Sequence, residues 1–302
     1  MVPGLGAARR GAGNSGDLTG VWTLGSYTDF QRPKELHSLV LTPAQADAYE
    51  APRRALGGMP ASKDGELGQA ESEFNERGSG LARVNGEIRS SWIINPADGQ
   101  IPYTAAAKAR FGLDKDPPLD HFDNPEDLNG ATRCVFNSAA GAPMMGNADS
   151  NLFEITETPG NVVILTEKFH DARIIRLGAN LAPDLRAPAW LGDSVGHWEG
   201  KTLMVETAGF RPGDTWRSRL HLSPSSRVTE RFTRAGPKSL YYQFTVEDPT
   251  LFTQVWRGEM MLDRAKGRIF EYACHEGNYS MSGILAGARH EETEAAARIH
   301  HQ

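Results

Sequence analysis

Cysteine is scarce in this chain: Cys134 and Cys274 are the only two among 302 residues. A small scaffold built on several disulfides is therefore excluded, because two thiols allow a single bridge. Two alternatives stay open at this point. Either the bridge forms, closing a loop of about 140 residues in an oxidising compartment, or the two residues are buried free thiols in a cytosolic protein.

Long apolar runs are also missing. No apolar segment approaches the length of about 20 residues that a membrane-spanning helix needs, so we expect no membrane insertion. Residues 1–16 lack the apolar region of a secretion signal and predict a disordered leader. Basic residues form no stripe and the net charge is -6, so a nucleic-acid partner is not expected.

The usual metal-binding and hydrolase patterns are absent or incomplete. No H-E-x-x-H or H-x-H spacing occurs, and the acidic stretch 114–127 does not match a calcium loop. Gly192–Gly196 does fit G-x-S-x-G, but a nucleophilic serine needs a helix directly after it. Here His197–Gly200 leads into a hairpin. We interpret Ser194 as a loop residue that bonds local backbone.

Turn-forming residues are abundant, with 32 glycines and 18 prolines. The stretch Trp190–Thr207 predicts a strand, a tight turn at Glu199-Gly200 and a second strand, because 201–206 alternate polar and apolar residues. About nine such strands are expected from residue 151 onward: both arms of the hairpin (the second over 201–206) and the ranges 152–157, 161–169, 172–177, 227–233, 239–247, 252–262 and 268–275. Two further strands are expected over 17–24 and 87–94. The chain is therefore predicted to be mainly β, an antiparallel β-barrel of lipocalin-like type or a closed sandwich.

A few helices are expected around these strands. Thr42 with Pro43 and Gln45 predicts a helix start, and the helix ends at Gly57-Gly58 if Pro52 does not end it earlier. Thr104 predicts the cap of a helix over 105–111, with Gly112 as its stop, and a C-terminal helix is expected over 283–299. We predict one barrel domain over 17–290 with insertions at 42–57 and 104–150, and a tail over 291–302.

Two clusters of polar residues at strand ends are candidates for catalysis. The first holds His170, Asp171 and Arg173, in which a carboxylate can orient an imidazole for proton transfer. The second holds His275 and Glu276 at the end of the last expected strand. In a barrel both clusters could lie at one mouth, as an acid–base site or, alternatively, as the ligands of a divalent metal. A metal-free site is preferred, because no metal-binding spacing supports the second option.

Further residues are candidates for contact with a substrate. They lie in the long 113–150 loop, in the hairpins and in the 272–279 segment, and a long irregular loop in a compact domain is commonly functional. The candidates are Arg133, Asn137, Met144, Met145, His197, His221, Asn278 and Tyr279. For a single histidine, an ordinary structural role with one hydrogen bond is the competing interpretation.

Several long runs resemble a large family of uncharacterised bacterial proteins. Residues 190–207 are similar to the run W-x-G-D-S-x-G-x-W-E-G-D-T-L-V-V-E-T, with Lys201 in place of the Asp, and 93–102, 162–173, 228–232 and 271–279 add to the resemblance. Members commonly carry a secretion signal, so the resemblance implies a periplasmic or secreted protein if a signal was removed, whereas the sequence as given predicts a cytoplasmic one. The resemblance implies no reaction. Gly20-Val21-Trp22 also resembles the opening strand of lipocalins, in which the tryptophan closes one end of the barrel.

The sequence thus predicts a small-molecule enzyme. Its substrate would be mostly apolar, of aromatic, terpenoid or polyketide-like type, and His170 with Asp171 or Glu276 would act as acid and base in a lyase, isomerase or hydrolase reaction. The alternative is a non-catalytic, lipocalin-like binding protein. A small hydrophobic or aromatic ligand is the expected partner, no cofactor is expected, and a homo-oligomer is compatible with the sequence.

Overall fold

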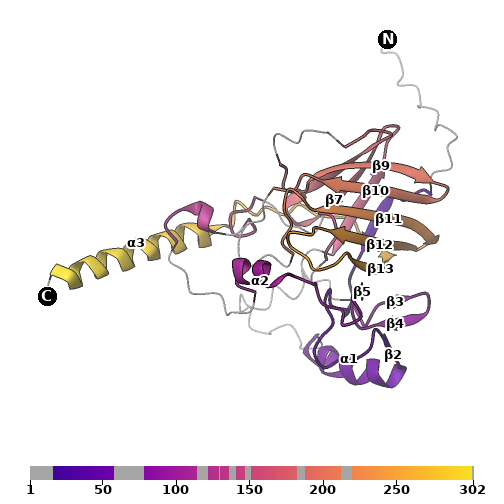
Figure 1. Ribbon diagram of the computed structural model, residues 1–302, viewed down its shortest axis with the longest axis horizontal. Coiled ribbons are helices and arrows are strands. Elements are labelled where there is room, and N and C mark those ends of the chain that lie inside the picture. Colours follow the sequence, from indigo (N-terminus) through magenta and orange to yellow (C-terminus); the bar gives the residue numbers. More distant parts are fainter. Residues whose placement is uncertain are drawn as a thin grey trace, which may run out of the picture.

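A closed β-barrel forms the centre of the molecule (Figure 1). This computed structural model describes residues 16–57, 78–113, 122–128, 130–135, 141–146, 151–181, 188–211 and 220–300. In order around the barrel, the strands are β1 (Gly20–Thr23), β6 (Leu152–Glu157), β7 (Asn161–Thr166), β8 (Ala172–Leu177), β9 (Asp193–Glu199), β10 (Thr202–Ala208), β11 (Arg227–Gly236), β12 (Ser239–Glu247) and β13 (Trp256–Arg264). The sheet closes because β1 pairs with both β6 and β13. The predicted mainly β barrel is confirmed.

Strand periodicity explains why the barrel has a filled interior. In β7 and β12, alternate residues are buried, so one face of each strand points inward. The inward side chains include large groups such as Phe153, Phe232 and Phe244, all at most 2% exposed. A barrel of this size is wide enough to be filled by its own side chains, and these residues form one continuous apolar core.

One neighbouring pair departs from the expected antiparallel arrangement. Strands β8 and β9 run parallel, whereas the other described neighbours around the barrel run antiparallel. Strands β8 and β9 therefore begin at the same end of the barrel, where β10 and β12 finish. The described parts of the connection between β10 and β11 (209–211 and 220–226) and the connection 248–255 also lie there. We call this end the loop end.

Trp22 closes the barrel away from the loop end. Its ring is fully buried, and its indole nitrogen donates a hydrogen bond to the carbonyl of Leu18 at 2.8 Å. The guanidinium groups of Arg234 and Arg264, from the last residues of β11 and β13, lie 4.8 and 5.1 Å from the ring centroid. Two cations over one indole stabilise this plug by cation–π attraction.

A small subdomain packs against the outside of the barrel (Figure 1). It contains the sheet β2 (Val40–Leu41), β4 (Glu87–Arg89), β3 (Arg83–Val84) and the helix α1 (Pro43–Gly57). As predicted, Thr42 and Gln45 cap α1 reciprocally, and Pro52 lies within the helix without ending it. The expected strand 87–94 is split: β4 belongs to this sheet, whereas β5 (Ile93–Asn95) pairs with β13.

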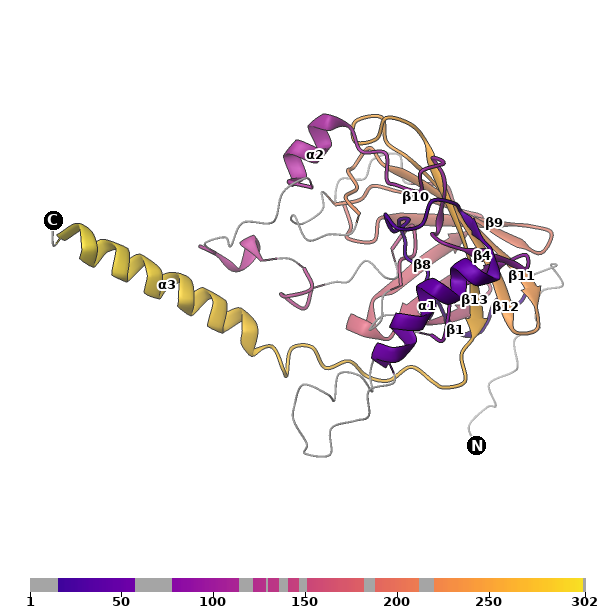
Figure 2. The same cartoon turned by 90° about the horizontal axis from the view of Figure 1, so that it is seen from below.

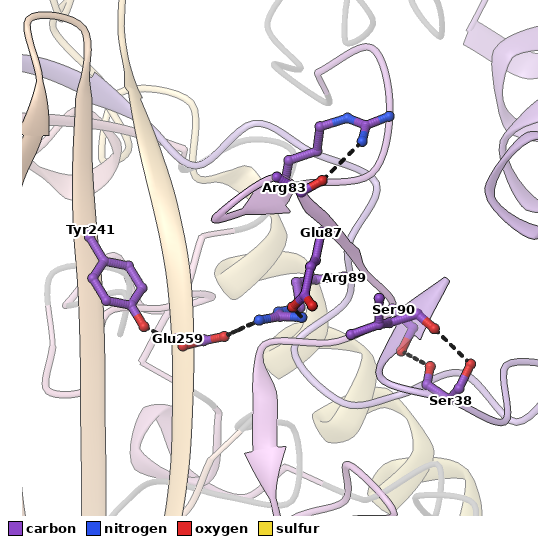
Figure 3. Close-up of polar contacts among 9 residues, drawn as sticks. Ser38, Arg83, Glu87, Arg89, Ser90, Tyr241 and Glu259 are labelled. Carbon is purple, nitrogen blue, oxygen red and sulfur yellow. Dashed lines mark hydrogen bonds and ion pairs between the residues drawn. The ribbon is translucent and has the colours of Figure 1, made fainter. Parts of the chain in front are cut away.

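A chain of polar contacts fastens this subdomain to the barrel (Figure 3). Arg89 is buried and donates to Glu259 of β13 from Nε at 3.1 Å and from Nη2 at 2.7 Å. Tyr241 of β12 donates to the second oxygen of Glu259, and Arg89 also bonds Glu87. Burial, followed by the effect of Glu259, raises the pKa of the Tyr241 hydroxyl, so it stays protonated and keeps donating.

Helix α2 (Ala105–Phe111) lies over the loop end, with the predicted caps at both of its ends (Figure 1). The Thr104 hydroxyl accepts from the amide of Ala107, and Gly112 adopts the left-handed conformation that favours glycine. The amide of Thr104 donates to the carbonyl of Leu251 at 2.8 Å, and Tyr103 forms a bridge with Phe252. These contacts fix α2 to the 248–255 connection.

The chain after β13 differs from the prediction. The expected strand 268–275 is absent from the described sheets, and residues 265–278 run along the outside of the barrel instead (Figure 2). The C-terminal helix is confirmed as α3 (Tyr279–His300), which projects away from the barrel and includes most of the expected tail. None of the described helices is both long and apolar enough to cross a membrane.

Candidate functional site

Five neighbouring strands each place one polar side chain inside the barrel near the loop end. We call this set the polar belt. All its members are at most 2% exposed, whereas most of the other inward side chains are apolar. The polar belt consists of Arg173 (β8), Ser194 (β9), Thr207 (β10), Glu230 (β11) and Tyr242 (β12).

Arg173 is the centre of the polar belt. Its guanidinium forms a two-pronged ion pair with Glu230, in which Nη1 donates to Oε1 at 3.1 Å and Nη2 donates to Oε2. Nε donates to Ser194 at 3.0 Å, and Nη2 also donates to Thr207 at 2.8 Å. A buried charge is tolerated only when it is paired and fully hydrogen-bonded, and Arg173 meets both conditions.

The polar belt is covered by residues 141–145, which are all buried. Arg173 Nη1 donates to the carbonyl of Gly141 at 3.2 Å, and the amide of Met144 donates to the Tyr242 hydroxyl at 2.8 Å. Tyr242 in turn donates to Glu230 at 2.7 Å. Burial, followed by the charge of Glu230, raises the pKa of this hydroxyl well above its ordinary value, so Tyr242 stays protonated.

Ser194 is not placed as a hydrolase nucleophile. It lies within β9, where a nucleophile elbow would need a helix to follow. Its hydroxyl bonds Arg173 and lies 2.9 Å from the Thr207 hydroxyl. The prediction that it bonds local backbone is therefore wrong in its detail, because strand pairing sets Ser194 opposite Thr207.

His221 is a further buried polar residue at the loop end. Unlike the guanidinium of Arg173, its ring is not hydrogen-bonded by the surrounding side chains that the structure describes. The side chain is fully buried, yet neither ring nitrogen has a hydrogen-bond partner among the described residues. Leaving a buried polar group unpaired costs about 1–3 kcal/mol, so such a group in a folded protein calls for an explanation. An imidazole with two free nitrogens is ready to contact a ligand.

Aromatic rings surround the His221 imidazole. The Phe111 ring is stacked on it, with centroids 3.9 Å apart and an interplanar angle of 7°. Tyr103 meets it edge-on at 6.4 Å, and Tyr103 also packs against Phe252. The Tyr103 hydroxyl accepts from the amide of His221 at 2.9 Å. The site is thus apolar, with one imidazole and one hydroxyl as its polar groups, a composition typical of small-molecule sites.

A hydrogen-bonded turn holds the segment that carries His221. The carboxylate of Asp248, which is 2% exposed, accepts from the hydroxyls of Ser223 and Ser226, both at 2.6 Å. Burial opposes ionisation of Asp248, but bonds from Ser223, Ser226 and Thr250 outweigh it, so the pKa of the carboxyl lies below its ordinary value. An ionised Asp248 anchors both connections at the loop end and fixes the position of His221.

The environment keeps both polar groups of this site neutral. Burial, with a further contribution from the nearby Arg110 charge, lowers the pKa of His221 to about 4. Burial raises the pKa of Tyr103 to about 12. At neutral pH the imidazole therefore carries one proton and one free lone pair, so it can both donate and accept.

The first predicted cluster is divided by the barrel wall. Arg173 points inward, whereas His170 and Asp171 lie on the β7–β8 connection, with His170 exposed. His170 Nε2 accepts from the amide of Tyr272 at 2.9 Å, and Glu167 likewise accepts from the amide of Phe270. These bonds dock the 265–278 segment on the barrel surface.

The second predicted cluster stays on the outside of the molecule. His275 and Glu276 are exposed, and Tyr279 is 81% exposed at the start of α3. The bond from the amide of Tyr272 brings this segment close to His170, but the side chains of His170, His275 and Glu276 are all exposed. Their grouping in one site at the barrel mouth stays a prediction. Cys134 and Cys274 form the disulfide that was left open, and Asn278 bonds the carbonyl of Thr132 at 2.8 Å beside it.

The remaining predicted contact residues lie in different places. Met144 and Met145 belong to the buried segment 141–145 that covers the polar belt, and they are 0% and 3% exposed. Arg133 is half-buried in the loop held by the disulfide, and His197 is an exposed residue of β9 that lies 3.3 Å from Glu199. Asn137 lies outside the described residues. Of the predicted histidines, the structure places His221 alone in a buried, aromatic environment.

Sequence motifs do not predict Glu230, Tyr242 and Tyr103 as site residues. A usable signal exists for the first two, because each occupies an inward position in an otherwise apolar series. Glu230 lies between Val228 and Phe232, and Tyr242 lies between Leu240 and Phe244. A polar residue in the buried phase of a strand must find a partner inside. For Tyr103, which lies just before a helix cap, the sequence carries no such signal.

Comparisons with known proteins add no assignment. No family model matches the chain, and no curated protein has a significantly similar sequence. The resemblance of 190–207 to an uncharacterised bacterial family therefore stays a prediction. Within the part of the chain that the structure describes, no group of three or more His, Cys, Asp or Glu residues is arranged to hold a metal ion.

Proposed function

We propose that the loop end binds a small, mostly apolar molecule and acts on it by acid–base catalysis through His221. The observation that carries this proposal is the fully buried imidazole, whose two nitrogens have no hydrogen-bond partner in the part of the chain that the structure describes. The polar belt is less suited to this role, because every donor of Arg173 already has an acceptor. His221 therefore replaces His170 and Glu276 as the proposed catalytic group.

A neutral imidazole suits reactions in which a proton moves between two positions of one substrate. One nitrogen accepts a proton from carbon while the other donates to an oxygen that gains charge. Isomerisation and elimination next to a carbonyl are reactions of this kind. Because burial holds the pKa of His221 at about 4, the empty site is a weak base. Negative charge that develops on the substrate would raise the basicity of the ring as the reaction proceeds.

Isotope exchange tests the proposal without knowledge of the natural substrate. The protein is incubated in D₂O with a set of small aromatic and terpenoid ketones, and deuterium uptake next to the carbonyl is followed by mass spectrometry. We expect uptake with at least one compound and a loss of about 100-fold or more in His221→Asn, the usual contribution of a general base. His197→Asn is the matched control, because His197 is exposed on β9. Equal exchange by wild type and His221→Asn would exclude the catalytic role.

One observation favours a second candidate, binding without chemistry. Among the described residues, no carboxylate contacts the His221 ring, so no acid group orients it as in catalytic His–Asp pairs. In that case the same compounds would raise the melting temperature of the wild-type protein more than that of His221→Asn. Neither protein would promote deuterium uptake.

A further inference from the structure

The Phe111 ring occupies a position that an aromatic ligand could take. It lies flat on the His221 imidazole, a position that covers the face of the buried group without satisfying either nitrogen. The ring is only half-buried, so its outer side reaches the surface. A molecule that displaced it could therefore enter from solvent and reach the imidazole.

The described contacts that fix α2 to the 248–255 connection lie at its N-terminal side. In α2 the side chain of Ala107 is the buried one, and the firm contacts at Thr104 and Tyr103 lie before the helix begins. Gly112 follows Phe111 directly, with open space around the position that a Cβ would take. Rotation of the Phe111 side chain, or a small shift of this last turn, would expose the imidazole face while the first turn stays in place.

A cation lies beside the same ring. The Arg110 guanidinium carbon is 5.2 Å from the Phe111 ring centroid, and its side chain is exposed. Arg110 is also close enough to His221 to disfavour a positive charge there. A ring in the place of Phe111 would therefore contact an imidazole, with a guanidinium nearby. A planar aromatic group that carries a negative charge matches both neighbours.

We propose that the His221 site takes small aromatic carboxylates, whose ring replaces Phe111 against the imidazole and whose charge faces Arg110. This inference rests on the proposed function in that it uses the same site. Phe111 then competes with the ligand. The apparent affinity equals the intrinsic affinity multiplied by the fraction of molecules in which Phe111 has left the site. Removing the Phe111 side chain brings that fraction to one.

Calorimetric titration with benzoate tests this competition in the full-length protein. We expect measurable binding to wild type and binding about tenfold tighter to Phe111→Ala, as for a competent state populated at about 10%. Arg110→Gln should weaken benzoate binding about fivefold, the scale of a partly exposed charge contact. Lys108→Gln, which removes another cation of α2, is the matched control and should bind like wild type.

Benzyl alcohol supplies the ring without the charge. It should bind more weakly than benzoate to wild type, and its affinity should not change in Arg110→Gln. Equal affinities for the two compounds, or benzoate binding that is unchanged or weaker in Phe111→Ala, would overturn the inference. If Phe111→Ala does not fold, as judged by circular dichroism, Phe111→Leu tests the same competition, because it also removes the stacked ring.

Failure of this inference can be told apart from failure of the proposed function. Deuterium exchange into neutral ketones that depends on His221, with no benzoate binding, overturns the ligand class and leaves catalysis standing. Benzoate binding with the predicted pattern, without deuterium exchange into any ketone, supports the ligand class and removes the catalytic role.

Discussion

Removal of one charge from the polar belt should cost a large part of the stability of the protein. In Glu230→Gln the side chain keeps its shape, but the Arg173 cation stays buried with only neutral acceptors. These are the new amide oxygen, Ser194, Thr207 and the carbonyl of Gly141. Two unit charges about 3 Å apart attract by about 5 kcal/mol at an effective dielectric constant of about 20. Breaking a buried pair by removing one partner typically costs about 3–5 kcal/mol. We expect a loss in this range.

Urea unfolding followed by tryptophan fluorescence measures the loss. With a slope of about 3 kcal/mol/M, the midpoint should fall by about 1–1.7 M while the slope stays constant. Glu206→Gln is the matched control. Glu206 of β10 forms a pair of 2.6 Å with Arg227, but both side chains are about half exposed, at 46% and 58%. Such surface pairs contribute about 0–1 kcal/mol.

A double variant separates the pair from its surroundings. Arg173→Met with Glu230→Gln removes both charges, so it should be less destabilised than the sum of the two single variants by about 2 kcal/mol or more. A loss in Glu230→Gln no larger than that in Glu206→Gln would refute the reasoning, since it would mean that the buried cation finds water or another partner at little cost.

Three further predictions concern other parts of the molecule. The pKa of His221 is about 4 in the folded state and its ordinary value is 6.5, so between these pH values the unfolded chain binds a proton that the folded protein does not. The free energy of unfolding should therefore fall by on the order of 2–3 kcal/mol as the pH drops from 6.5 through 4, and by less in His221→Phe. Urea midpoints of the two proteins that change in parallel with pH would contradict this. The Cys134–Cys274 bridge closes a separation of 140 residues, so Cys134→Ser with Cys274→Ser should lose up to about 5 kcal/mol in the chain-entropy model; a melting temperature within a degree or two of wild type would contradict this. A Cβ on Gly258 would lie 2.2 Å from the Phe244 ring, so Gly258→Ala should cost about 1–3 kcal/mol in urea unfolding, whereas Gly160→Ala, with open space around it, should be near neutral.

Local signals were sufficient to predict most of the barrel and the helix ends. The strands from Leu152 onward alternate clearly, and the caps at Thr42 and Thr104 form as predicted, because caps and alternation depend on neighbours in sequence. The predictions that were wrong concern contacts between segments far apart in the sequence. Residues 268–275 have the composition of a strand, but β13 already pairs with β12, β1 and β5. With its ladder positions used, the barrel offers this segment no partner strand.

The candidate site was predictable only in part. Arg173 and His221 were selected as chemically capable residues, but their surroundings depend on which strands become neighbours. Arg173 meets Glu230 across 57 positions of sequence, and His221 meets Tyr103 across 118. Pairing over such distances follows from barrel closure, and no spacing rule within one segment encodes it. Conversely, His170 and His275 looked like parts of a site because each follows an apolar run, although their side chains lie on the outside.

The parallel contact between β8 and β9 has a consequence for how this barrel closes. In a closed ring of strands that alternate up and down, an odd number cannot alternate all the way round. Nine strands therefore require at least one pair that runs in the same direction, and here the chain places it between Leu177 and Asp193. The chain must travel back along the whole barrel there, where a hairpin would need only a tight turn. Because β8 and β9 run in the same direction, Arg173 and Ser194, which both lie near the start of their strands, are close enough to bond. A barrel with an even number of strands could alternate all the way round and would need no such return.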